Sequence, residues 1–243
     1  MARARPAIVA MSPRGIPADV KAIRDKIKEF LDTDTDHGKI GNCPFGVYVF
    51  YDYDGEPIYV GQTYETLRQR IGRHLTNQRT DAVAMNVLDP FEVAEIEVWP
   101  CWDLVAEGAN LGKKARAESI AKAKTHLNSV EFTVFAKVLG LSSFGAILNE
   151  KDVPQTAKVK LPTSHRQGII PSELHDGRKH PDVRIARRAS TIASLARVIS
   201  ERKVSAGLRR TLLTQARRLE KLASQRLEDF AAAMPEREAE EEE

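Results

Sequence analysis

Cysteine, aromatic residues and long apolar runs are all scarce in this sequence, and each scarcity excludes a class of protein. Cys43 and Cys101 are the two cysteines among 243 residues, too few for a disulfide framework or a zinc cluster. We expect both to be reduced thiols in a cytoplasmic protein. No apolar run approaches the roughly 18 residues that a membrane helix requires, and the apolar stretch after Arg3 and Arg5 is too short for a signal peptide. With 42% hydrophobic residues, the chain can build a core of one or two domains.

Charge is distributed unevenly along the chain, although the net charge is only +3. Residues 1–150 contain 18 Lys and Arg against 20 Asp and Glu, whereas residues 151–235 contain 18 against 8. Clustered basic charge is typical of a protein that binds a polyanion, but it also fits a solvated helix surface. Residues 236–243 contain six Glu and one Arg, and we expect this self-repelling tail to be disordered.

The first 150 residues show the pattern of a small α+β domain. Val20, Ile23, Ile27 and Phe30 recur at helical spacing over 18–31. Further along, β-branched and aromatic runs, an Asp-Gly turn and apolar periodicity predict strands over 46–51, 57–61 and 91–99 and helices over 63–78, 115–127 and 130–139. The order β-β-α-β-α predicts an antiparallel sheet of three strands flanked by helices, with a break between the last two helices near Asn128.

The remainder of the chain divides into a loop-rich segment and two helices. Four prolines punctuate residues 150–182, and helical patterns cover 183–200 and 208–230. The second helix carries an apolar stripe that packs either on the core or on a second subunit: Leu208, Leu212, Ala216, Leu219, Ala223, Leu227 and Phe230. The predicted units are an N-terminal helical extension (1–44), a core domain (45–150), a basic loop-rich segment (151–182), a C-terminal helical hairpin (183–235) and the tail (236–243).

Two short motifs carry the chemical information in this sequence. Gly46-Val47-Tyr48 is followed after ten residues by Tyr59-Val60-Gly61, and then by a predicted helix that carries Arg70 and His74. This combination resembles the GIY-YIG nuclease family over about residues 45–150, with Val in place of Ile in both motifs. The spacing of Arg70 and His74 is similar to that in GIY-YIG type II restriction endonucleases.

The chemistry of these residues agrees with the resemblance. Paired strands can bring Tyr48 and Tyr59 to one face, and a four-residue spacing puts Arg70 and His74 on one side of a helix. We expect Tyr48 to act as the base, Tyr59 and Arg70 to hold the scissile phosphate, and His74 to support them. Taken singly, the tyrosines also fit an ordinary cross-strand pair, and Arg70 a solvated arginine.

The resemblance also implies a carboxylate that holds one Mg²⁺ or Mn²⁺, and often an asparagine. Glu131, in the helix over 130–139, and the later Asn149 match these positions. Asn128 and Glu131 also fit a helix-capping box, a purely structural role, and Glu118 on the preceding helix is the rival metal ligand. We expect Glu131 to be the ligand.

The overall expectation is a metal-dependent DNA endonuclease that cuts double-stranded DNA, of the type II restriction class. The basic loops and C-terminal helices would then contact DNA, with His165, His175 and His180 among the contacts. A palindromic target implies a homodimer, and restriction implies a companion DNA methyltransferase. The alternatives are another GIY-YIG nuclease of phage, homing or repair type, and a non-catalytic DNA-binding protein on the same scaffold.

Overall fold

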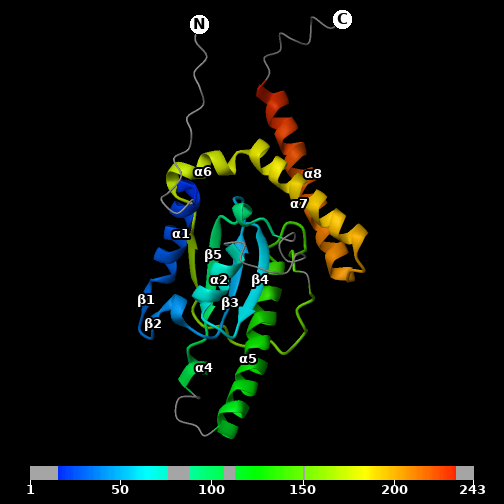
Figure 1. Cartoon of the computed structure of the whole chain (residues 1–243). Helices are drawn as coiled ribbons and strands as arrows, with labels where there is room; N and C mark the ends of the chain where they lie inside the picture. Colours follow the sequence, from blue (N-terminus) through cyan, green and yellow to red (C-terminus); the bar gives the residue numbers. More distant parts are fainter. Residues whose placement is uncertain (1–15, 76–87, 107–112, 150, 234–243) are drawn as a thin grey trace, which may run out of the picture.

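A computed structural model describes residues 16–75, 88–106, 113–149 and 151–233 of the chain (Figure 1). The helices are α1 (Ala18–Leu31), α2 (Leu67–Leu75), α4 (Asp103–Ala106), α5 (Lys113–Leu139), α6 (Ser172–Lys179), α7 (Pro181–Glu201) and α8 (Ala206–Ala233), with short 3-10 turns η1 (Ile40–Asn42) and η2 (Pro90–Glu92). The strands are β1 (Asp34–Thr35), β2 (Gly38–Lys39), β3 (Gly46–Tyr51), β4 (Pro57–Thr63), β5 (Glu95–Pro100) and β6 (His165–Gly168). In this part of the chain no helix is both long and apolar enough to cross a membrane.

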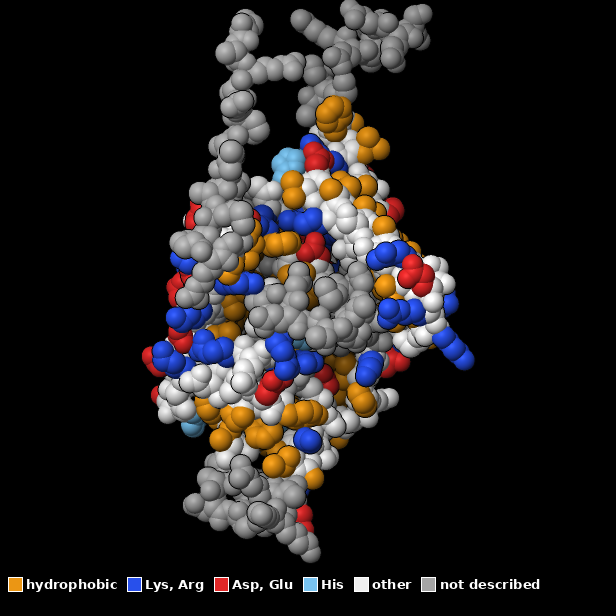
Figure 2. All heavy atoms as spheres, viewed as in Figure 1, with side chains coloured by type: hydrophobic (Ala, Val, Ile, Leu, Met, Phe, Trp, Pro, Cys, Tyr) orange, Lys and Arg blue, Asp and Glu red, His pale blue; other side chains and the backbone are white. Residues whose placement is uncertain are grey.

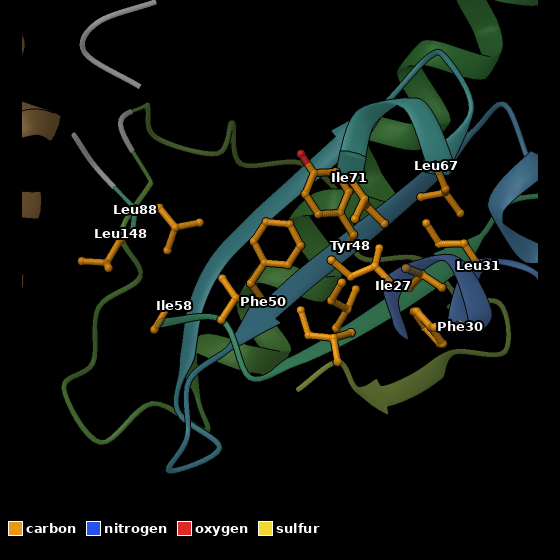
Figure 3. Packing of buried hydrophobic residues seen from close by; sticks show 14 of the residues in the cluster. Ile27, Phe30, Leu31, Tyr48, Phe50, Ile58, Leu67, Ile71, Leu88 and Leu148 are labelled. Atoms are coloured by element: carbon orange, nitrogen blue, oxygen red, sulfur yellow. The ribbon is translucent and has the colours of Figure 1, made fainter. Parts of the chain in front are cut away.

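The main sheet is antiparallel and has the strand order β4-β3-β5-β6. β3 is buried along its whole length, because helices cover both of its faces. Tyr48 and Phe50 point into a core shared with α1, α2 and the C-terminal helices (Figure 3). Val47 and Val49 point the other way, against the apolar side of α5, as the two-residue period of a strand requires.

The α+β class is therefore confirmed, but the expected three-stranded sheet is wrong because β6 adds a fourth strand. β6 lies within the segment expected to be loop-rich, and its sequence is His-Arg-Gln-Gly. It joins the edge of β5 through backbone hydrogen bonds, and its side chains alternate between half-buried and exposed. A polar edge strand of this kind has none of the β-branched or apolar alternation by which strands are predicted.

The expected break near Asn128 is also absent, since α5 runs unbroken from Lys113 to Leu139. Asparagine disfavours helix interiors because its side chain competes for backbone groups. Here the Asn128 amide oxygen instead accepts a hydrogen bond from the Gln62 side chain, at 2.8 Å. The capping-box role of Glu131 is consequently wrong, because Asn128 lies in the middle of a helix.

Other predicted boundaries shift by a few residues. The strand expected to begin at 91 begins at Glu95, because Asp89 caps the 3-10 turn η2 before it. The helix expected over 63–78 begins at Leu67, and its last expected residues lie outside the described part of the chain. The acidic tail 236–243 also lies outside it.

Helices α7 and α8 pack along each other as a hairpin (Figure 1). Leu208 and Leu212 of the expected α8 stripe pack against the core, but most of the buried face of α8 differs from that stripe. Besides Gly207, its buried positions are Leu208, Thr211, Thr214, Gln215, Arg218 and Leu222. Leu227, from the predicted stripe, is 69% exposed, and Phe230 is 56% exposed. An analysis that counts only apolar residues misses a helix face whose centre is an arginine.

Buried ion pairs attach this hairpin to the core. We call the group formed by Asp52, Glu56, Glu92, Arg184, Arg188 and Arg218 the ion cluster; all six residues are buried. Its carboxylates come from the β3–β4 turn and η2, and its arginines from α7 and α8. Several of the basic residues expected to contact DNA are therefore paired with carboxylates inside the protein.

Within the ion cluster each arginine contacts at least one carboxylate. Arg188 contacts Asp52 at 2.8 Å and Glu92 at 3.2 Å. Arg184 contacts the same two residues at 3.3 and 3.4 Å. Arg218 contacts Glu56 at 3.3 Å and donates to the Pro57 carbonyl at 2.9 Å. Burial lowers the pKa of Arg218 to about 10, so the guanidinium remains charged at neutral pH.

Candidate active site

An irregularity in strand pairing brings the two motif tyrosines to one face of the sheet. Phe50 lies opposite Tyr59 and Tyr51 opposite Pro57, so one residue of β4, Ile58, is extra in the register. Such a bulge redirects the side chains that follow it. Tyr59 therefore shares a face with Tyr48, and their rings are stacked with centroids 6.1 Å apart.

Gly61 makes room for the first tyrosine. It pairs with Tyr48 across β3 and β4. A Cβ atom at position 61 would lie 2.5 Å from the Tyr48 hydroxyl and 2.6 Å from Cζ of the same ring. These separations are shorter than van der Waals contact, so glycine is required for the ring to cross the strand here.

Helix α2 supplies two polar partners to the Tyr48 hydroxyl. Arg70 donates a hydrogen bond to it from Nε at 3.1 Å, and His74 Nε2 lies 2.9 Å away. Because the arginine can only donate, the hydroxyl proton is free to point toward His74. Burial alone would lower the pKa of Arg70, but Tyr48 and then Tyr59 raise it through charge and hydrogen bonding. His74 is itself only 5% exposed, so it contacts Tyr48 rather than solvent.

A cleft of about 410 Å³ opens at the β4 edge of the sheet. Since β4 is an edge strand, side chains from both faces of the sheet reach this cleft. Tyr59 and Arg70 line it from the α2 side and Glu131 from α5, with Asn149 also in its wall. Tyr48 is fully buried behind Gly61, which does line the cleft.

Glu131 is the unusual carboxylate of this cleft. It is 8% exposed, and in the described part of the chain its carboxylate accepts no hydrogen bond. Burial raises its pKa to about 7, against the opposing effect of the Arg70 charge. Glu118 lies on the same helix but is exposed and is not part of the cleft wall. Of the two candidate ligands, the geometry brings only Glu131 to the other site residues.

Asn149 reaches the cleft although 18 residues separate it from Glu131. Its amide bonds both backbone groups of Val60, accepting from N at 3.2 Å and donating to O at 2.9 Å. The backbone of Leu148 donates to the Ile58 carbonyl at 2.9 Å. Residues 148 and 149 thus pair with the open edge of β4, so Asn149 fixes the strand that carries Tyr59 and Gly61.

Sequence reasoning gave no role to Gln62, which lines the same cleft. Its amide nitrogen donates to Asn128, which also accepts from the Tyr64 hydroxyl at 3.3 Å. Gln62 Oε1 is buried without a hydrogen-bond partner in the described part of the chain. The signal that could have found this contact was Asn128, a poor helix former in an otherwise helical stretch.

The histidines expected to contact DNA lie elsewhere. His165 belongs to β6, His175 packs beside the Tyr53 ring, and the ring of His180 accepts a hydrogen bond at the start of α7. None of the three lines the cleft.

The donor set fits a divalent cation held mainly by one carboxylate. The described residues contain no cluster of three or more His, Cys, Asp and Glu side chains with metal-binding geometry. Mg²⁺ often keeps several waters and takes its other ligands from substrate phosphate. The Glu131 carboxylate is buried, faces the cleft and accepts no hydrogen bond from any described residue, which suits that coordination.

Comparison with protein families gives one match. Residues 44–126 match the GIY-YIG catalytic domain, which supports the GIY-YIG nuclease family and identifies a nuclease-type domain. The matched segment contains both tyrosine motifs and α2, and it ends before Glu131 and Asn149. Comparisons with curated proteins and with solved structures found no significant match.

Proposed function

We propose that the protein is a metal-dependent DNA endonuclease that hydrolyses phosphodiester bonds in double-stranded DNA. The observation that carries this proposal is the arrangement of the cleft. A phenol held between Arg70 and His74 lies directly behind a wall that also presents Tyr59 and a desolvated Glu131. Phosphodiester hydrolysis requires a base, a cation for the developing charge and a grip on the phosphate, and these groups can supply all three.

Tyr48 is the proposed base. An isolated tyrosine has a pKa near 10, so it needs help to lose its proton. The neighbouring Arg70 guanidinium favours the phenolate, and His74 Nε2 can accept the hydroxyl proton at 2.9 Å. The phenolate then takes a proton from the attacking water.

Arg70 and Tyr59 are the proposed phosphate ligands. Both line the cleft. Arg70 hydrogen-bonds Tyr48 through Nε and also hydrogen-bonds Tyr59, but a guanidinium has five N–H donors, which lets the same side chain also donate to phosphate oxygens. Glu131 is the proposed holder of one Mg²⁺ or Mn²⁺. When bound, the cation stabilises negative charge on the phosphate and favours deprotonation of water. Asn149, the remaining expected site residue, lines the cleft and positions the β4 edge through Val60.

The finer assignment is a type II restriction endonuclease that acts in the cytoplasm beside a cognate DNA methyltransferase. It is supported by the Arg70 and His74 spacing, which is similar to that of GIY-YIG restriction enzymes. A symmetric duplex target would then be cut by a homodimer, one strand per subunit. Sedimentation of the full chain with a palindromic duplex tests the dimer, and one subunit per duplex would contradict it.

Digestion of unmethylated phage DNA by the purified full chain tests the function. We expect discrete fragments with Mg²⁺ and none with EDTA. A metal-dependent smear would retain the nuclease but contradict site specificity. Salt-sensitive binding without any cleavage would contradict the enzyme and leave a DNA-binding protein on a nuclease scaffold.

A further inference from the structure

Two groups of cations in the C-terminal hairpin have different surroundings. The buried group, Arg184, Arg188 and Arg218, belongs to the ion cluster and faces carboxylates of the core. The exposed group lies around the connection between α7 and α8, which we call the hairpin tip (residues 197–210). It consists of Arg197, Arg202, Lys203, Arg209 and Arg210.

The hairpin tip carries an excess of positive charge. Glu201 is its single acidic residue against five cations. Within the described chain, only Arg210 of these five forms an ion pair, and its partner is Asp152. Figure 2 shows Lys and Arg side chains at the right-hand edge of the molecule, where Figure 1 places the α7–α8 connection. Most of this charge is therefore available to a polyanion.

The hairpin tip and the first turn after it adjoin the candidate active site. Asp152, the ion-pair partner of Arg210, lines the cleft beside Lys151. One residue beyond the tip, the Thr211 hydroxyl donates to the backbone carbonyl of Asn149 at 3.4 Å, and Asn149 also lines the cleft. The exposed cations therefore lie on a surface that reaches one rim of the cleft through Arg210.

We infer that the hairpin tip binds phosphates of the duplex that flank the scissile bond, whereas the buried arginines of the same two helices only attach the hairpin to the core. This inference rests on the proposed function, because it takes DNA as the occupant of the cleft. In the cleft, Arg70 and Tyr59 bind one phosphate of the DNA. Duplex DNA carries a charge about every 1.7 Å of its axis, so neighbouring phosphates need further cations. Arginine suits them because its planar fork matches phosphate oxygens.

Binding of the full chain to a labelled DNA duplex, measured by fluorescence anisotropy in EDTA over a range of KCl concentrations, tests the inference. The double substitution Arg202→Gln/Arg209→Gln should weaken binding roughly tenfold. It should also lower the slope of log affinity against log salt by about 1.8, because each phosphate contact contributes about 0.9.

Two matched variants separate phosphate binding from other effects. Arg202→Lys/Arg209→Lys keeps the charge and should bind nearly as the wild type does. Lys21→Gln/Lys28→Gln removes two exposed cations from α1 and should leave the salt slope unchanged. The inference is wrong if the Gln variant of the tip binds with wild-type affinity and salt slope. It is also wrong if the α1 variant lowers affinity and salt slope as much as the Gln variant of the tip does.

The same samples with Mg²⁺ distinguish this inference from the proposed function. Cleavage by the wild type with unchanged binding by the tip variants would overturn the inference alone. Binding that depends on the tip, without cleavage by the wild type, would overturn the nuclease and retain the inference. Absence of DNA binding by the wild type would overturn the inference.

Discussion

Two polar clusters lie along the β3–β4 hairpin, and they use similar residue types in different ways. The ion cluster, beside the turn, sets the three carboxylates of Asp52, Glu56 and Glu92 against the three arginines of α7 and α8. The candidate active site, farther along the same strands, holds one arginine among tyrosine hydroxyls, together with a Glu131 carboxylate that accepts no hydrogen bond from the residues that the structure describes.

This difference indicates that the ion cluster attaches the hairpin to the core, whereas the candidate active site carries the chemistry. Buried charges that are paired inside the protein are not available to bind a ligand. They affect stability, because removal of one partner leaves the other charge buried and unpaired. A desolvated carboxylate that faces a cleft is a charge that a cation can still compensate. We therefore expect substitutions in the ion cluster to reduce stability, and substitutions around the cleft to reduce activity.

The largest effect on stability is expected from Arg188→Gln. This substitution leaves Asp52 and Glu92 with too little compensating charge in a buried place, so the free energy of unfolding should fall by about 3–5 kcal/mol. Chemical denaturation measures it. A loss below about 1 kcal/mol would show that the cluster is not a structural link, and cleavage per folded molecule should change little.

Arg70→Lys tests the candidate active site, where we expect activity rather than stability to fall. Lysine keeps the positive charge but loses the fork that serves both Tyr48 and the phosphate. We expect cleavage to fall by about 10²–10³-fold, the range found when one oxyanion donor is removed. Single-turnover cleavage measures this loss, and the melting temperature should remain near that of the wild type. Wild-type cleavage would contradict the role proposed for Arg70.

Gly61→Ala should affect both properties moderately. The new Cβ would overlap the Tyr48 hydroxyl, and such overpacking typically costs about 1–3 kcal/mol. The displaced phenol should also reduce cleavage. Gly177→Ala is the matched control, because nothing lies within 4 Å of its Cβ position in α6, and alanine there should stabilise the helix by about 0.5–1 kcal/mol. Equal effects of the two substitutions would contradict the packing argument.

The smallest effect is expected from Arg226→Gln. Arg226 binds both oxygens of Asp182, at 2.8 and 3.0 Å, and in this respect it resembles the arginines of the ion cluster. The pair lies on the surface, where solvent screens it, so its loss should lower the free energy of unfolding far less than Arg188→Gln does. Denaturation beside Arg188→Gln gives the comparison, and equal losses would show that burial does not determine the effect.

The features that sequence could predict are those set by neighbouring residues. Alternation in β3 and the spacing from Arg70 to His74 place side chains on a face without knowledge of the rest of the fold. Helical periodicity likewise predicted α1, α7 and α8. The motif tyrosines follow from the same local rules, apart from the bulge at Ile58.

The features that sequence could not predict depend on distant partners. Arg218 is buried because Glu56 and the Pro57 carbonyl, about 160 residues earlier, receive its charge. β6 forms because the edge of β5 is open to it. Asn128 remains helical because its side chain accepts a hydrogen bond from Gln62 and does not compete for backbone groups of the helix. No window of local sequence contains these pairs, so hydrophobic periodicity alone gave a different face for α8 and a break in α5.

Cleavage of duplex DNA in Mg²⁺ by Glu131→Gln, with thermal melting of the same sample, tests the central claim most directly. Glu118→Gln on the same helix is the control. We predict that Glu131→Gln abolishes cleavage and melts no lower than the wild type, whereas Glu118→Gln retains both. Normal cleavage by Glu131→Gln, or loss of cleavage in Glu118→Gln alone, would contradict the assignment of this cleft as the active site.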